Sequence, residues 1–105
     1  MIFAIKNGKP IVRTAARRDA NERSIIKAME AEGAFVRQIN DEGRFDLLVW
    51  HKGNTLLMEV KDGAKPPSAR RLSDAEQKFH DEWPGNNLHV VISEAEAIAV
   101  LRSCG

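Results

Sequence analysis

The feature that most constrains this fold is a pair of short apolar segments, residues 45–50 and 55–61, separated by Lys52-Gly53-Asn54. Each segment has the length and the Leu, Val and aromatic content of a β-strand, and the residues between them favour a tight turn. Apart from a few charged residues, both segments are almost entirely apolar, so both faces of the hairpin are expected to be buried. We therefore expect the hairpin to be central and buried in a sheet.

Turn and capping residues divide the remaining chain into further elements. Asn7-Gly8 predicts an N-terminal hairpin of residues 2–6 and 9–13, and Gly33 ends a helix that begins near Asp19. The other expected elements are a strand over 34–39, a turn over 40–43, a helix from Ser73-Asp74-Ala75-Glu76 to about residue 84, a strand over 88–92 and a last helix to about residue 102. This order predicts a single α/β domain with a mixed sheet flanked by helices.

The composition agrees with such a domain. Of the 105 residues, 43% are apolar and 30% are charged, which is typical of a globular protein and argues against a disordered or low-complexity chain. The longest apolar stretches are far too short to span a membrane, and the N-terminus lacks the pattern of a signal peptide. The single cysteine, Cys104, suits a reducing compartment. We expect a cytoplasmic protein without a membrane partner.

Three charged side chains interrupt the apolar hairpin. With Lys52-Gly53 as the loop, Asp46 lies opposite Glu59, and with Gly53-Asn54 as the loop it lies opposite Lys61. In both registers the two acids and the lysine share one face of the hairpin, because strand residues alternate with period two. Burying such a cluster is costly unless it serves a function, although a buried ion pair is the plainer alternative.

Oxygen ligands suggest what the acids could bind. Two neighbouring carboxylates repel each other, and a divalent cation between them relieves the repulsion; ligands that are all oxygen suit Mg²⁺ or Mn²⁺. Such an ion polarises a phosphodiester and lowers the pKa of a bound water, while Lys61 would face the nucleophile or the developing phosphate charge. The residues thus predict metal-assisted hydrolysis of a nucleic-acid backbone.

The string Glu59-x-Lys61 is weak evidence by itself, because roughly 0.6 accidental matches are expected for the Glu and Lys content of this chain. A second match, Glu76-x-Lys78, lies on an expected helix, where residues two apart do not share a face. Only the first match lies on an expected buried strand with an acid facing it.

The helix before the hairpin carries a carboxylate on its apolar side. Glu22 shares a face with Ile25, Ile26 and Met29, and a carboxylate that faces the core must be neutralised, paired or bound to a metal. Alternatively, Asp19 is the N-cap of this helix and Glu22 is its capping-box partner at the third helical position.

Asp46, the following Glu59-x-Lys61 and the helix that bears Glu22 resemble the PD-(D/E)xK nuclease superfamily, and Leu72-Ser73-x-x-x-Gln77 with the strand before Ser93 resembles its VRR-NUC branch. The resemblance covers residues 18–101 and leaves residues 1–13 as a hairpin arm of the single domain, 1–105. It implies a restriction-endonuclease-like αβββαβ core followed by a C-terminal helix. Phe45 stands where the superfamily has a proline, which is not a ligand.

The resemblance also implies roles for individual residues. The implied catalytic set is Glu22, Asp46, Glu59, Lys61 and Gln77, in which Lys61 is the catalytic lysine, Glu22 an accessory acid and Gln77 a polar residue that lines the site. The implied metal ligands are Asp46, Glu59, the carbonyl oxygen of Val60, and Glu22, with Mg²⁺ or Mn²⁺ as the metal and no small-molecule cofactor.

Standalone domains of this branch resemble phage-type proteins that cut branched DNA, including four-way (Holliday) junctions, in a bacterial or phage-infected host cell. Resolving a junction needs two symmetric cuts, so this function implies a homodimer, for which the N-terminal hairpin and Trp83 are candidate contacts. The alternatives are a nuclease that cuts flaps, single strands or nicked duplex, a catalytically silent DNA-binding module, and a small interaction protein in which the buried charges form an ordinary ion-pair cluster.

Basic residues gather in two parts of the chain. Residues 1–27 carry seven Lys or Arg against two acids, and a second basic group precedes residue 72, although solvated surface charge explains this equally well. The nuclease resemblance makes the expected phosphate contacts Arg17, Arg18, Arg23, Lys65, Arg70 and Arg71. We find no recognition helix and no aromatic platform in the sequence, so recognition by backbone geometry and a steep salt dependence are expected.

Overall fold

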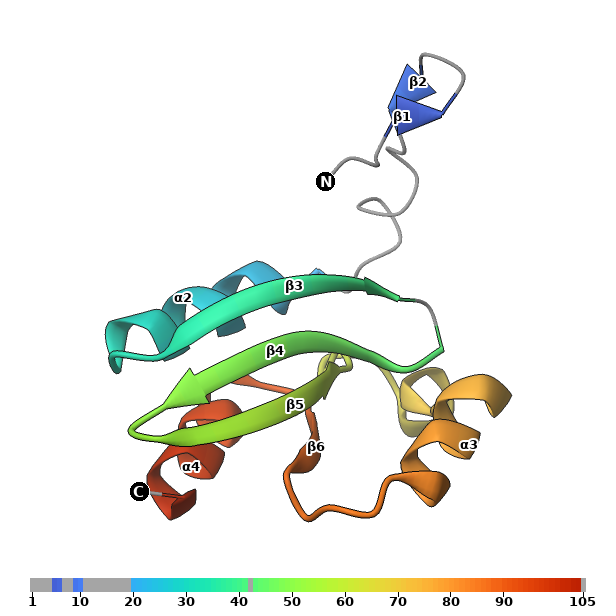
Figure 1. Cartoon of the computed structure of the whole chain (residues 1–105). Helices are drawn as coiled ribbons and strands as arrows, with labels where there is room; N and C mark the ends of the chain where they lie inside the picture. Colours follow the sequence, from blue (N-terminus) through green and yellow to red (C-terminus); the bar gives the residue numbers. More distant parts are fainter. Residues whose placement is uncertain (1–4, 7–8, 11–19, 42, 105) are drawn as a thin grey trace.

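The computed structural model of the chain describes residues 5–6, 9–10, 20–41 and 43–104. Four strands form a mixed sheet in the order β3-β4-β5-β6 (Figure 1). The strands β3 (Phe35–Asp41), β4 (Phe45–His51) and β5 (Asn54–Val60) pair antiparallel, and β6 (Leu88–Val91) pairs parallel with β5. The expected α/β class is confirmed at this level, as a mixed sheet flanked by helices.

The turn of the central hairpin decides between the two registers that the sequence allowed. Lys52 and Gly53 both have positive φ, +49° and +85°, which is the geometry of a two-residue turn that follows the twist of the strands. His51 therefore pairs with Asn54, and the ladder continues to the pair Leu47 and Met58. Beyond Leu47 and Met58, the next residues away from the turn are Asp46 and Glu59. This is the register in which Asp46 was expected opposite Glu59.

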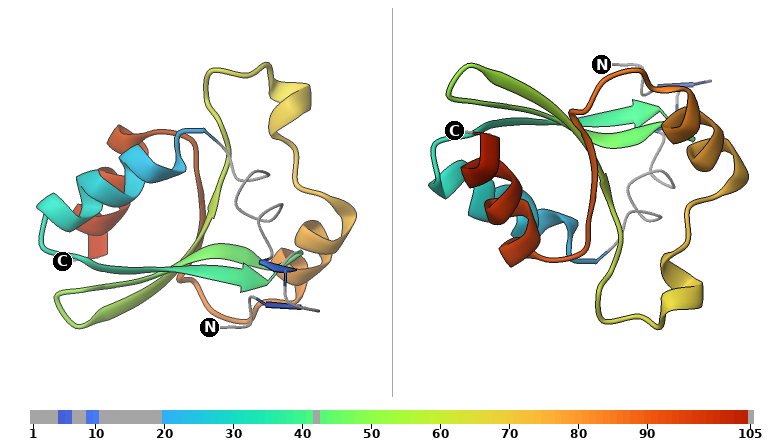
Figure 2. Two further views of the ribbon diagram at one scale, coloured as in Figure 1. Left: turned by 90° about the horizontal axis from the view of Figure 1, so that it is seen from above. Right: turned by 90° about the horizontal axis from the view of Figure 1, so that it is seen from below.

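Two helices cover one face of this sheet. α2 (Glu22–Ala31) and α4 (Glu94–Cys104) lie side by side against it, as Figure 2 shows from two opposite directions. Ile25 and Met29 of α2 and Leu101 of α4 are fully buried against apolar strand residues, which confirms the apolar stripe expected on α2.

The third helix, α3 (Asp74–Glu82), follows the short 3-10 helix η1 (Pro67–Arg70) in the crossover between β5 and β6. It lies at the end of the sheet where β5 turns away from β4 (Figure 2). Its capping box is confirmed, because the Ser73 side chain accepts from the Glu76 N–H while the Glu76 carboxylate accepts from the Ser73 N–H. The ring of Phe79 contacts those of Phe45 and Trp83, which fixes the helix against the start of β4.

Several element boundaries differ from those expected. α2 begins at Glu22 rather than near Asp19, and the preceding residue, Asn21, makes no side-chain cap. Glu22 therefore occupies the first and not the third helical position, so the capping-box alternative for Glu22 is wrong; Asp19 itself lies outside the described residues. The strand β3 continues to Asp41, two residues into the expected turn, because a bulge after Gln38 lets the pairing with β4 continue.

The N-terminal hairpin is described only in part. β1 (Ile5–Lys6) pairs antiparallel with β2 (Lys9–Pro10), in the register expected for a turn at residues 7 and 8. The rest of the predicted arm, 1–13, lies outside the described residues. In the part of the chain that the structure describes, no helix has the length and apolar character needed to cross a membrane.

Candidate active site

Buried and half-buried charged side chains form a cluster at the end of β5 and the start of α3. The Lys61 ammonium donates to the Glu76 carboxylate at 3.0 Å between Nζ and Oε1, and lies 3.4 Å from Oε2 of Glu59. Glu59 is only 2% exposed. We call Glu59, Lys61 and Glu76 the acid–lysine cluster. The predicted proximity of Glu59 and Lys61 is therefore observed, with a third member from a helix.

Asp46 lies next to this cluster. Its Oδ2 accepts from the backbone N–H of Val60 at 2.7 Å, just beyond the last pair of the β4–β5 ladder, Leu47 and Met58. The Asp46 carboxylate thus takes the place of the backbone carbonyl that would accept from the Val60 N–H in a continuing ladder. The negative charge of Asp46 also contributes to raising the pKa of Glu59. The structure therefore brings Asp46, Glu59 and Lys61 to one end of the hairpin.

The pKa values in the cluster follow from burial and from the carboxylates. Burial, with a hydrogen bond to Glu76 and the charge of Asp46, raises the pKa of Glu59 to about 10. Burial alone would lower the pKa of Lys61, but Glu76 and Glu59 outweigh it and raise that pKa. Burial alone would likewise raise the pKa of Glu76, but its hydrogen bonds to Glu59, Ser73 and Lys61 lower it. At neutral pH the cluster thus holds a protonated Glu59 beside an ionised Glu76 and a charged Lys61.

Glu76 is the site residue that sequence reasoning missed. It belongs to the second Glu-x-Lys string, which was set aside because a helix separates the two side chains of such a string, and Lys78 indeed pairs with Glu82 on the exposed side of α3. The available signal was the capping box, which fixes the Glu76 carboxylate at the N-terminus of α3. Only the packing of α3 beside the end of β5 brings this carboxylate to Lys61.

Glu22 is buried, as expected for a carboxylate on the core side of α2, and is 3% exposed. Its Oε2 accepts from Nε2 of Gln38 at 3.0 Å. Gln38 is the pairing partner of Leu47, on the face covered by α2, whereas Glu59 alternates to the other face. Glu22 therefore reaches the sheet from the face opposite to Glu59.

Gln77, expected to line the site, directly follows Glu76 on α3. It is exposed, and its Nε2 donates to Oδ1 of Asp81 one turn further along α3. Val60, whose carbonyl oxygen is an implied ligand, is 1% exposed and contributes its N–H to Asp46.

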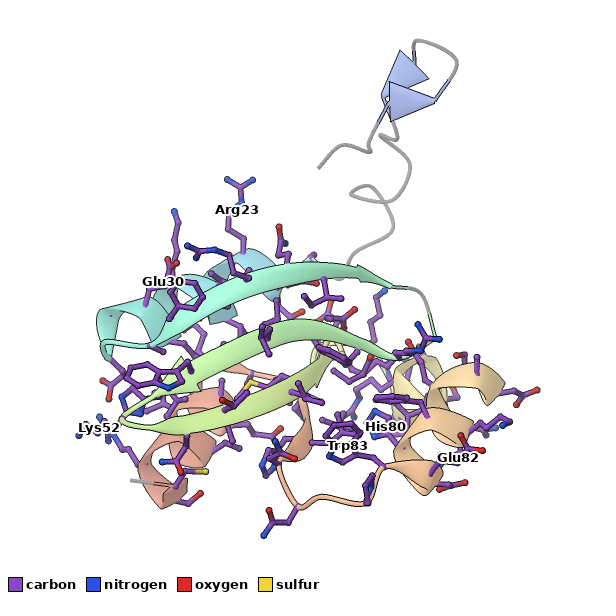
Figure 3. All side chains as sticks on the ribbon, in the orientation of Figure 1. Arg23, Glu30, Lys52, His80, Glu82 and Trp83 are labelled. Atoms are coloured by element: carbon purple, nitrogen blue, oxygen red, sulfur yellow. The ribbon has the colours of Figure 1, made fainter. Side chains whose placement is uncertain are left out.

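The expected phosphate contacts are surface residues where the structure describes them. Arg23 projects outward from α2 (Figure 3), and Lys65 and Arg71 are exposed on either side of η1. Arg70 is half-buried, and its Nε donates to the carbonyl of Lys65, which orders this basic loop. Arg17 and Arg18 lie outside the described residues.

Asn21 connects the start of α2 to the end of the hairpin. Its Nδ2 donates to the carbonyls of Lys61 and Ile92, both at 3.0 Å. These carbonyls lie just beyond the ends of β5 and β6, so one amide holds both strand ends beside α2. No role was predicted for Asn21 from the sequence.

The donor atoms suit a hard cation in their chemistry. The carboxylates of Asp46, Glu59 and Glu76 are all oxygen donors, and a divalent cation would relieve the repulsion among them. Burial is the main cause of the raised pKa of Glu59, and the charges of Asp46 and Glu76 add to it. The arrangement of these carboxylates does not match their chemical suitability. Among the described residues, no group of three or more His, Cys, Asp or Glu side chains is arranged to hold a metal ion. The residues thus fit such an ion by type, while their present contacts are with Lys61, the Val60 N–H and each other.

Comparison of the chain with protein-family models, with curated proteins and with solved structures gave no match.

Proposed function

We propose that the chain is a Mg²⁺- or Mn²⁺-dependent endodeoxyribonuclease that hydrolyses phosphodiester bonds in branched DNA. The observation that carries the proposal is the buried meeting of Glu59 and Lys61 at the end of β5, with Asp46 bonded to the residue between them. Charges of this kind are costly to bury and are concentrated at functional sites. The order α2, β3, β4, β5, α3, β6 is compatible with the αβββαβ core of the PD-(D/E)xK superfamily, which the motif resembles.

The roles of the residues follow from their contacts. Asp46 and Glu59, with the Val60 carbonyl, would hold the cation. Glu22, the fourth expected ligand, is bonded to Gln38 on the opposite face of the sheet and would have to leave that contact to take part. A bound divalent cation supplies positive charge to the phosphate and lowers the pKa of a coordinated water. Glu59 must give up its proton for this role, and Lys61 is kept charged by Glu76, ready to stabilise the negative charge that develops on the phosphate. Glu76 thus acts as a positioning residue for Lys61.

The proposed substrate is DNA recognised mainly through its backbone. Arg23, Lys65, Arg70 and Arg71 are the described residues that would contact phosphates, and each lost contact should reduce the salt dependence of binding. A junction would be cut by a homodimer, because the described residues of one chain form one acid–lysine cluster and two strands must be cut.

A catalytically silent DNA-binding module is a second candidate, favoured by one observation. The carboxylates near Lys61 are already engaged by protein groups, and the described residues include no ready-made ligand set for a metal. In such a module the acid–lysine cluster would serve only to fix α3 beside β5.

The first prediction tests this function. The purified chain with Mn²⁺ or Mg²⁺ should cut a panel of junction, flap, single-stranded and nicked DNA, and should be inactive in chelator or Ca²⁺. Glu59→Gln and Lys61→Ala should each lower cleavage at least about 100-fold while binding and the fold are retained, because the first removes a ligand and the second removes charge stabilisation. Product mapping on a junction should show paired symmetric cuts.

Lys78→Ala is the matched control, because Lys78 belongs to the other Glu-x-Lys string and pairs with Glu82 on the exposed side of α3. It should cut as well as the unmodified chain. Cleavage that persists in both Glu59→Gln and Lys61→Ala would refute the assignment. DNA binding without cleavage under any metal condition would favour the silent module.

A further inference from the structure

Two large aromatic side chains on the sheet are exposed to solvent. Phe35 of β3 and Trp50 of β4 are pairing partners, and each is 48% exposed. Trp50 also pairs with Thr55, and Leu48 with Leu57, so period-two alternation places Trp50 on the face of the sheet that carries Glu59. The helices α2 and α4 cover the opposite face. The aromatic pair is therefore on the same face as the acid–lysine cluster.

The charged side chains on the strand segments beside this pair are positive. The Arg37 guanidinium lies 3.9 Å from the centre of the Phe35 ring, and its Nη1 donates to the backbone carbonyl of Val36. Lys52 extends from the tip of the hairpin that carries Trp50 (Figure 3). The strand segments 33–39, 47–57 and 88–92 contain no Asp or Glu. We call Phe35, Arg37, Trp50 and Lys52 the aromatic–cation surface.

We propose that this surface binds unpaired nucleotides of a nucleic acid, with bases stacked on Phe35 and Trp50 and phosphates beside Arg37 and Lys52. Flat aromatic rings beside cations suit a ligand that is itself aromatic and anionic, and sequence-tolerant stacking of this kind is the usual basis of single-strand binding. The aromatic platform that the sequence did not reveal arises because Phe35 and Trp50, fifteen positions apart, become neighbours across the β3–β4 pair.

A second copy of the chain fits this surface less well. A two-fold axis through the surface would bring Arg37 and Lys52 of one protomer against the same cations of its partner, with no carboxylate on these strand segments to offset the repulsion. An anionic ligand has no such cost.

The position of the surface relative to the cluster deepens the proposed function, on which this step rests. Trp50 lies four positions from Asp46 along β4, which is roughly 13 Å of extended strand. That distance corresponds to roughly four nucleotides of stacked single strand. The preferred substrate is therefore DNA with an unpaired segment of at least that length beside the scissile bond, rather than a fully paired duplex.

Binding of labelled strands in chelator, where no cleavage occurs, tests the inference. The probes are a single strand of about 12 nucleotides and a strand of equal length in which every nucleotide is abasic. The chain should bind the base-bearing strand at least about tenfold more tightly than the abasic strand, because each stacked base contributes about 1–3 kcal/mol. Phe35→Leu and Trp50→Leu, which keep an apolar side chain but remove the ring, should each abolish most of that difference without changing the abasic affinity.

Two controls keep the result interpretable. Trp50→Phe should retain the preference for bases, and Val90→Ala should leave both affinities unchanged, since Val90 is an exposed apolar residue on β6 without an aromatic ring and is 41% exposed. Circular dichroism checks the fold of each variant. Equal affinities for base-bearing and abasic strands would overturn the inference. So would Leu variants that change the sedimentation mass from dimer to monomer at unaltered DNA affinity, because a second copy would then be the occupant.

The cleavage assay separates this inference from the proposed function. Base-dependent binding that the Leu variants abolish, in a chain that cuts no DNA, would leave the aromatic–cation surface established and the nuclease proposal refuted. Cleavage of branched DNA by a chain that binds the base-bearing and the abasic strand equally would support the nuclease proposal and refute the aromatic–cation surface.

Discussion

Glu59 shows how one buried residue links stability to protonation. Its ordinary pKa of 4.5 is raised to about 10, so the folded chain retains a proton that the unfolded chain releases above pH 4.5. The stability that this proton contributes is present below pH 4.5 and is lost progressively as the pH rises toward 10. At neutral pH Glu59 therefore lowers the free energy of unfolding relative to its value below pH 4.5. Such a loss of stability is typical of residues kept for function.

The corresponding prediction concerns Glu59→Gln in chelator. Because glutamine cannot ionise but can still donate to Glu76, the free energy of unfolding of the variant should exceed that of the unmodified chain at pH 8 by on the order of 1 kcal/mol or more. The gap should close near pH 4, as measured by urea denaturation at several pH values. Glu82→Gln is the control, since Glu82 is exposed on α3 and should show no such gap. A variant less stable than the unmodified chain at pH 8 would contradict the protonated state of Glu59.

At the scale of elements, one side chain of α3, Glu76, both caps the helix and binds Lys61. The Glu76 carboxylate accepts from the Ser73 N–H at 2.8 Å to complete the capping box, and from Lys61 at 3.0 Å. The helix start is thereby tied to the end of β5. The sequence predicted the first of these contacts from a local pattern, but the second required knowing where α3 packs.

Two variants should separate these tasks. Ser73→Ala removes the hydroxyl that caps the helix and should lower the free energy of unfolding by about 1 kcal/mol, while the pKa of Lys61 stays as it is. Glu76→Gln removes the charge beside Lys61 and should lower the pKa of Lys61, because Glu76 is the larger of the two influences that raise it. NMR titration of the Lys61 side chain measures this. An unchanged Lys61 pKa in Glu76→Gln would show that the two groups are not in contact.

At the scale of the whole molecule, Asn21 joins three segments that are far apart in the sequence. One side-chain amide donates to carbonyls after β5 and after β6 while its own residue precedes α2. It therefore sets the position of the helix that carries Glu22 relative to the strand that leads into Lys61. Losing these bonds should loosen the end of the sheet where the acid–lysine cluster lies.

We predict that Asn21→Ala lowers the free energy of unfolding by about 1–3 kcal/mol, because it leaves two carbonyls without their donor. Asn21→Asp should be at least as harmful, since an ionised carboxylate of the same shape would face two carbonyl oxygens. Hydrogen exchange of the Lys61 amide, which donates to the Val91 carbonyl, should accelerate in both variants. Asn86→Ala, at an exposed loop position, should change stability by less than about 0.5 kcal/mol. Equal stability of Asn21→Ala and Asn86→Ala would show that the amide bonds contribute nothing.

Local patterns determined much of this protein. The Gly residues after α2 and in the β4–β5 turn, the capping box of α3 and the apolar stripe of α2 act over a few residues, so the sequence alone predicted the elements, their order and the shared face of Glu59 and Lys61. The nuclease resemblance depends on those same residues and stays a prediction.

Tertiary packing decided what no short pattern contains. Glu76 reaches Lys61 because α3 docks beside β5, Glu22 meets Gln38 because α2 covers the other face, and Phe35 lies beside Trp50 because two strands pair. Gln77, expected at the site, is exposed, whereas Glu76 and Phe79 on the same helix are half-buried and contact Lys61 and Phe45. Each of these outcomes depends on contacts between residues far apart in the chain, and the periodicity of one segment carries no information about which neighbour will pack against it.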